Sequence, residues 1–336
     1  MALGRIWRYG AGCSLVAASA MLVAFGSSSA SLADSGWLGQ ATATSPPATT
    51  RGSMAYDAAT HTVVLLRGSQ TWTWNGSTWK LQHPATTPPS RGGASMVYDT
   101  ASRTVVLFGG LSTKCGHACA HLNDTWTWNG SDWTQQHPAT SPAARWMASM
   151  AYDATTHTVV LFGGGLVHSA AANDTWTWNG SDWTRKHPAT SPAARQDAPA
   201  AYDGATHTVV LFAGYDISSG VGYNQTWAWN GSTWNLQHPA TSPSGRAGSS
   251  MAYDAATASA VLFGGGTNLL QNDTWTWNGS DWTQQHPATS PSVREEMAMA
   301  YDGATSTVVL FGGLGVGGAL NDTWIWDGST WTQKGP

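Results

Sequence analysis

Hydrophobic and polar positions along this chain alternate in short runs that are typical of β-strands. Between residues 145 and 195 the pattern predicts three such strands: 148–152, which is small and apolar, 158–162, which is β-branched, and 175–178, which alternates Thr with Trp. Because successive side chains of a strand point to opposite faces, Trp176 and Trp178 share one face. Asn179-Gly180 then predicts a tight turn into a fourth strand. No segment after residue 33 predicts a helix.

This four-strand unit recurs six times at a spacing of about fifty residues. Each copy contains a Tyr-Asp pair, and the tyrosines are Tyr56, Tyr98, Tyr152, Tyr202, Tyr253 and Tyr301. One meander cannot bury both of its faces alone, so six must pack face to face around an axis. The sequence therefore predicts an all-β, six-bladed β-propeller with four antiparallel strands per blade. It would span residues 34–336, with repeats that start near residues 51, 91, 145, 195, 246 and 294.

Two features of the unit resemble the kelch repeat. The second strand ends at Gly-Gly or a variant, and later a Trp is followed seven residues on by another, as in Trp126 and Trp133. An arginine also opens five of the units, at Arg91, Arg145, Arg195, Arg246 and Arg294. The resemblance covers the chain after residue 33 and implies a kelch-type propeller. It departs at Arg67-Gly68 and Ala213-Gly214, where we expect a glycine-only backbone to be less needed.

The sequence contains one more candidate fourth strand than the six blades need. Trp37 precedes Tyr56 by nineteen residues, the spacing that separates Trp79 from Tyr98, so it marks a fourth strand. Trp331 marks another, which gives seven candidates for six blades. We expect either the Trp37 segment or the Trp331 segment to close the last blade, with the other displaced or added as a fifth strand.

The first 33 residues differ in composition from the repeats. Arg5 and Arg8 precede an apolar run at 13–26, and Ser31-Leu32-Ala33 supplies small residues. This order is typical of a secretory signal peptide that is cleaved before Asp34. A retained membrane anchor is the alternative, although the run is short for a bilayer core of about 30 Å. We expect a protein that is secreted or held in the cell envelope, with no membrane span after cleavage.

Charge excludes one class of partner. Charged residues make up 10% of the chain, against roughly 25% in an average globular protein. The net charge is −4, and no Lys/Arg cluster occurs. Because nucleic-acid binding needs a basic surface, we expect no nucleic-acid partner. We also expect a monomer without a cofactor.

One face of the predicted propeller carries the non-repeated residues. In a meander, the loops between the second and third strands lie on the same face as the links between units. These loops vary in length, which is typical of a binding surface. The candidate binding residues on this face are Arg91, Arg145, Trp146, Arg195, Asp197, Arg246, Arg294, Glu295 and Glu296. Solvated rim residues are the alternative interpretation. The arginines would favour an electronegative ligand, since guanidinium groups grip carboxylates in a bidentate fork.

The longest loop holds the two cysteines that follow the predicted signal peptide. Cys115 and Cys119 are interleaved with His117 and His121. In an exported chain a disulfide between these cysteines is the favoured interpretation. A zinc or copper site, with His168 from the next unit, is the alternative.

The sequence favours a binding module for a protein or glycan ligand, possibly acidic, over an enzyme. Kelch-type propellers include copper oxidases resembling galactose oxidase, but those have seven blades and a Cys–Tyr crosslink for which this chain has no suitable cysteine. They also include sialic-acid mutarotases, and that resemblance implies an acid/base role for Glu295 and Asp197 beside Arg294 and Arg195. A structural surface component is a third possibility. Fold alone does not decide among them.

Overall fold

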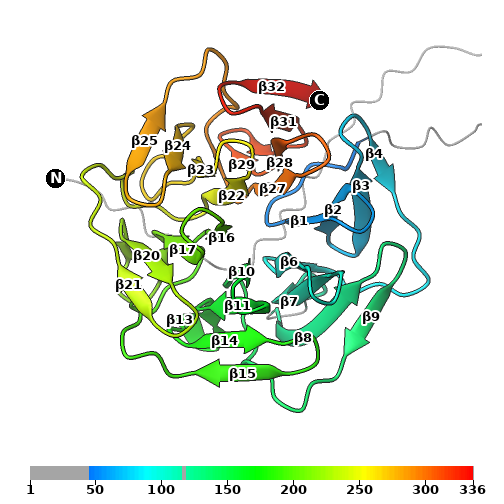
Figure 1. Cartoon of the computed structure of the whole chain (residues 1–336). Coiled ribbons are helices and arrows are strands. Elements are labelled where there is room, and N and C mark those ends of the chain that lie inside the picture. Colours follow the sequence, from blue (N-terminus) through cyan, green and yellow to red (C-terminus); the bar gives the residue numbers. More distant parts are fainter. Residues whose placement is uncertain (1–44, 116–118, 336) are drawn as a thin grey trace, which may run out of the picture.

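The computed structural model describes residues 45–115 and 119–335. These residues form five antiparallel sheets of four strands and one of five, together with three small sheets of two or three strands. The large sheets stand around a central axis (Figure 1). The first strand of each contacts its counterpart in the next, and the last sheet contacts the first. This closed ring confirms the predicted all-β propeller. The predicted signal peptide and Trp37 lie outside the described residues.

The strands of each blade follow one another along the chain. Blade one contains β1 (Ser53–Asp57), β2 (Thr62–Arg67), β3 (Gln70–Trp74) and β4 (Trp79–Leu81). Blade two contains β5 (Arg91–Gly92), β6 (Ser95–Asp99), β7 (Thr104–Ser112), β8 (His121–Trp128) and β9 (Trp133–Gln136). Blade three contains β10 (Ser149–Asp153), β11 (Thr158–Phe162), β14 (Thr175–Trp178) and β15 (Trp183–Lys186). Blade four contains β16 (Ala200–Asp203), β17 (Thr208–Phe212), β20 (Thr226–Trp229) and β21 (Trp234–Leu236). Blade five contains β22 (Ser250–Asp254), β23 (Ser259–Phe263), β24 (Thr274–Trp277) and β25 (Trp282–Gln285). Blade six contains β27 (Ala298–Asp302), β28 (Thr307–Phe311), β31 (Thr323–Trp326) and β32 (Trp331–Gly335).

Short strands decorate the loops between the second and third strands. They are β12 (Gly165–Leu166) and β13 (Ala170–Ala171) around the 3₁₀ turn η1 (Val167–Ser169), β18 (Tyr215–Asp216) and β19 (Val221–Gly222), and β29 (Leu314–Gly315) and β30 (Gly318–Ala319). A further short strand, β26 (Arg294–Glu295), precedes the first strand of blade six and pairs with β29. None of the helices among the described residues is long and apolar enough to cross a membrane.

The second strand of each blade is apolar on both faces because a blade lies on either side. In β11, Val159 and Leu161 pair with Trp178 and Trp176 and belong to a core cluster shared with the preceding blade. Val160 and Phe162 point the other way, into a cluster shared with the following blade. These four side chains are all buried. The predicted placement of Trp176 and Trp178 on one face is confirmed.

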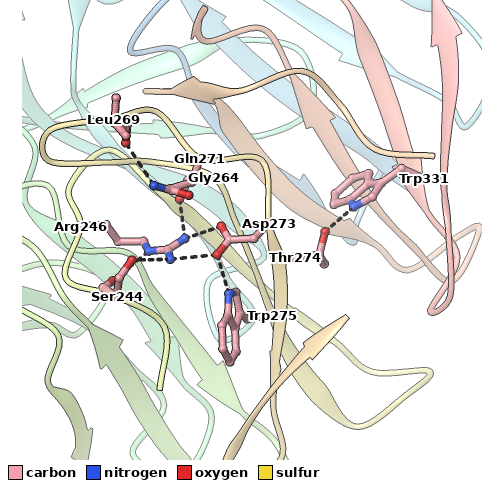
Figure 2. Close-up of polar contacts among 9 residues, drawn as sticks. All are labelled: Ser244, Arg246, Gly264, Leu269, Gln271, Asp273, Thr274, Trp275 and Trp331. Carbon is pink, nitrogen blue, oxygen red and sulfur yellow. Dashed lines mark hydrogen bonds and ion pairs between the residues drawn. The ribbon is translucent and has the colours of Figure 1, made fainter. Parts of the chain in front are cut away.

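Tryptophans also join neighbouring blades through hydrogen bonds. The indole Nε1 of each fourth-strand Trp donates to the Oγ1 of a third-strand Thr in the preceding blade, the Thr that directly precedes the first Trp of that strand. The pairs are Trp79–Thr323, Trp133–Thr71, Trp183–Thr125, Trp234–Thr175, Trp282–Thr226 and Trp331–Thr274, at 2.8–2.9 Å. Figure 2 shows the last of them. Each bond satisfies a donor that burial would otherwise leave unpaired.

Trp331 fills the outer position of the last blade. β32 pairs with β31, and every blade among the described residues is one continuous stretch of chain. The ring closes where the Thr49 amide donates to the Leu320 carbonyl, at 2.9 Å. Of the two segments expected to compete for the last blade, the Trp331 segment therefore occupies it.

Candidate functional site

The five arginines predicted to bind a ligand are buried in the scaffold instead. Their exposed fractions are 0–2%. In blade five, Arg246 donates to both carboxylate oxygens of Asp273, at 2.6 and 3.0 Å, and to the carbonyl of Gly264, the first glycine of the doublet, at 3.1 Å. Asp273 also accepts a hydrogen bond from the Trp275 indole (Figure 2). The same bidentate pairs recur as Arg91–Asp124, Arg145–Asp174 and Arg294–Asp322.

This arrangement corrects the expectation that the repeated arginines are available to a ligand, which was the reason for expecting an electronegative ligand. The guanidinium groups of these four arginines are neutralised by aspartates of their own blades and are out of reach of solvent. The Asn-Asp-Thr-Trp segment of the repeat supplies that aspartate. The repeated arginines therefore hold the Gly-Gly turn and the third strand together and leave no ring of free cations at the channel mouth.

Arg195 in blade four departs from the pattern. Gln225 replaces the aspartate and accepts from the Arg195 Nη2 at 3.0 Å, while the guanidinium lies 4.1 Å from the ring centroid of Tyr223. Burial without a carboxylate lowers the pKa of Arg195 to about 10. In the same blade, Ala213 takes the place of the first glycine and adopts the same positive φ, 58°. The expectation that glycine's freedom is less needed there was wrong, since the backbone conformation is unchanged.

The channel mouth is built two residues further along each repeat, five residues before each Tyr. All six residues there have φ between 50° and 66°, and they are Arg51, Gly93, Met147, Asp197, Gly248 and Glu296. Backbone hydrogen bonds link five of the six neighbouring pairs, from Gly93 N to Arg51 O at 2.9 Å, for example, and from Glu296 N to Gly248 O at 2.7 Å. One backbone geometry thus presents different side chains around the ring.

A cavity of about 180 Å³ opens at this ring. Arg51, Met147, Asp197 and Glu296 line it together with residues further down the first strand of each blade. Arg51 comes from blade one, Asp197 from blade four and Glu296 from blade six. Ring closure therefore brings together charged residues that are far apart in sequence.

An ion pair joins the two ends of the ring. The Arg51 Nε and Nη2 atoms each lie 2.7 Å from Glu296 Oε1. The guanidinium carbon also lies 4.8 Å from the centroid of the Trp146 ring, and His121 meets that ring edge-on at 6.3 Å. Trp146, a predicted binding residue, is 92% covered, as its exposed fraction is 8%. The buried Trp146 ring packs against the Arg51 guanidinium and so helps to hold it in position.

Two further carboxyl groups near the ion pair, those of Asp197 and Glu295, have pKa values raised to about 7. Burial, the charges of Glu296 and Glu295, and incomplete compensation by Arg51 raise the pKa of Asp197 to about 7. Burial and the charge of Glu296 raise the pKa of Glu295 to about 7. Gly248 lies between them, since a methyl group built on it would meet Glu295 Cβ at 2.9 Å and Asp197 Oδ2 at 3.5 Å. Paired carboxyl groups with raised pKa values are typical of functional sites.

The structure thus gathers three predicted site residues, Asp197, Glu295 and Glu296, at one mouth. It adds Arg51 and Met147, which the sequence analysis missed. Both could have been found in the sequence by comparing the residue five positions before each Tyr. That position holds glycine in two blades and a larger, different side chain in each of the other four. The repeated arginine, seven residues before the Tyr, drew attention to a structural position instead.

Cys115 and Cys119 form a disulfide in the loop between β7 and β8. His117 lies outside the described residues. Within residues 45–115 and 119–335, no group of three or more His, Cys, Asp or Glu side chains is arranged to hold a metal ion.

Comparison with known proteins places the fold. No family model and no curated protein matches the sequence. Among solved structures, 272 chains match the structure. One of them, described as the structure of YjhT, has a TM-score of 0.66 and 15% sequence identity over 87% of this chain and 99% of its own. The fold is therefore a β-propeller, as the resemblance of the sequence repeat to the kelch repeat implied. At this identity, the likeness to YjhT shows the fold alone.

Proposed function

We propose that the protein binds a neutral or positively charged glycan at the channel mouth. The observation that carries this proposal is that Asp197 and Glu296 line a cavity whose other charged lining residue, Arg51, is already paired with Glu296. Glu295 lies beside Gly248, which also lines this cavity. Carboxyl groups accept hydrogen bonds from sugar hydroxyls, and a partly protonated one also donates. A strongly acidic ligand would meet repulsion here, because the scaffold arginines are unavailable.

Glycan binding can be tested on the protein starting at Asp34 with a glycan array followed by calorimetry of each hit. We expect Asp197→Asn or Glu296→Gln to weaken binding by about 1–3 kcal/mol, the usual cost of losing a charge-assisted hydrogen bond. Ser131→Ala, at an exposed turn on the opposite face, is the matched control and should bind normally. Binding that survives both mouth substitutions would overturn this assignment, and ligands confined to proteins would favour a protein-binding module.

A second function, acid/base catalysis on a sugar ring, is favoured by the carboxyl pair with pKa values raised to about 7. Such groups exchange protons readily near neutral pH. Anomeric exchange of free sugars, followed by NMR, should then be faster than the spontaneous reaction and should slow in Glu295→Gln. Exchange at the spontaneous rate for every sugar that binds would leave binding alone as the function. Failure of both binding and exchange would favour a structural surface component.

We also propose export of the protein, on the grounds of the charge and hydrophobic pattern of residues 1–33. Amino-terminal sequencing of protein from the medium or envelope should begin at or near Asp34. Recovery of an intact amino terminus from membranes would contradict this.

A further inference from the structure

The opposite end of the channel carries a second cavity, which the proposed glycan site does not use. It has a volume of about 240 Å³ and is lined by three consecutive residues from the first strand of each blade. The last of the three is always a tyrosine, so a collar of six rings surrounds it: Tyr56, Tyr98, Tyr152, Tyr202, Tyr253 and Tyr301. Each Tyr lies five residues beyond the mouth ring, so strand geometry separates the two collars by about 16 Å.

A layer of methionine side chains lies between the two cavities. Met54, Met96, Met150, Met251 and Met299, with Ala200 in blade four, line both of them. The tyrosine cavity is therefore lined by apolar side chains toward the middle of the channel and by tyrosines at its outer end.

Negative charge surrounds the collar. Each Tyr is followed directly by an aspartate whose exposed fraction is 0–2%: Asp57, Asp99, Asp153, Asp203, Asp254 and Asp302. One oxygen of each accepts the backbone amide two residues on, at 2.9–3.0 Å. The Oδ2 atoms of Asp57, Asp203 and Asp302 have no hydrogen-bond partner in the part of the chain that the structure describes.

Few cations offset these carboxylates. The residue five positions after each Tyr is His61, Arg103, His157, His207, Ala258 or Ser306, so only blade two places a permanent cation there. Three of the histidines face a Tyr hydroxyl through Nδ1, at 3.2–3.5 Å. The negative charge of these aspartates acts on the tyrosines. Burial raises the pKa of Tyr56, and the charges of Asp302 and Asp57 raise this pKa further.

We infer that this tyrosine collar is a binding site for an organic cation, such as a quaternary or methylated ammonium group. Aromatic rings attract cations through their quadrupoles, and such groups are weakly hydrated and fit an apolar cavity. The buried carboxylates add attraction without forming direct contacts. The site is separate from the glycan site in position, at the opposite end of the channel.

The test uses the full protein from Asp34 and two probes of nearly the same shape. Choline carries the ammonium group, and 3,3-dimethylbutan-1-ol replaces its nitrogen with carbon. By calorimetry or NMR titration, we expect choline to bind saturably and the alcohol to bind about tenfold more weakly or not at all. Equal affinity for both probes, or no saturable binding of choline, would overturn the proposal.

Tyr301 is suited to substitution because its hydroxyl makes no hydrogen bond to another described side chain. Tyr301→Leu removes an aromatic face and should weaken choline binding about threefold to tenfold, whereas Tyr301→Phe keeps the face and should bind like the parent. Gln135→Ala, at an exposed position on the outer rim, is the control, and thermal melts confirm folding. Unchanged affinity in a folded Tyr301→Leu protein would exclude the collar as the site.

Discussion

Side chains at one register position give the channel mouth its chemistry. Arg51, Met147, Asp197 and Glu296 share a left-handed backbone with two glycines, a conformation that glycine adopts without a steric penalty and other residues adopt at some cost. The scaffold accepts glycine there, so the larger residues are not required for the backbone path. Their presence brings two carboxyl groups, Asp197 and Glu296, together with the guanidinium of Arg51 at one cavity.

The raised pKa of Asp197 makes stability depend on pH. Its pKa is about 7 in the folded protein against an ordinary value near 3.8, so between these values the folded protein holds a proton that the unfolded chain has released. Stability therefore falls as pH rises from about 4 to about 7. In calorimetric melts across this window, the midpoint should fall less steeply for Asp197→Asn than for the parent. Identical slopes would show that Asp197 titrates normally.

Five of the six blades contain a buried arginine that holds parts of the blade together. The Arg246 guanidinium connects the Ser244 carbonyl before the blade to the Gly-Gly turn after β23 and to the aspartate before β24. Without that aspartate, the charge would be buried and unpaired, which is strongly destabilising. Blade four relies on a neutral amide and an aromatic face instead.

Gln225→Asp should stabilise the protein, because it supplies Arg195 with the counter-ion that four other blades have. A charge-assisted pair in place of a neutral acceptor should add about 1–2 kcal/mol to the free energy of unfolding. The converse change, Asp273→Gln in blade five, should cost about 3 kcal/mol or more. Chemical denaturation of both variants measures this. A destabilised Gln225→Asp protein would indicate that blade four has repacked around the amide.

The ring as a whole closes through contacts between its first and last blades. β1 packs against β27, Thr49 bonds to Leu320, and the Trp79 indole donates to Thr323 across a sequence separation of 244. Six fourth strands fill six outer positions among the described residues. No position in this ring is left for a seventh.

A protein that begins at Ser45 should therefore melt at the same temperature as one that begins at Asp34. Deletion of residues 331–336 should instead lower the midpoint sharply, because Trp331 is fully buried and its loss leaves the Thr274 hydroxyl without its donor. Calorimetry of the two truncated proteins compares these effects. A lower midpoint on removal of residues 34–44 would show that the Trp37 segment contributes to the ring.

By itself, the sequence determined the repeat, the strand positions and the face-to-face packing. Strands 158–162 and 175–178 were predicted with their observed bounds, because alternation and turn chemistry are local properties. Only the tertiary structure decided which charges are free. Arg145 is buried against an aspartate 29 residues away, and Arg51 meets Glu296 across 245 residues. Ring closure creates these contacts, and no local pattern encodes which side chains it brings together.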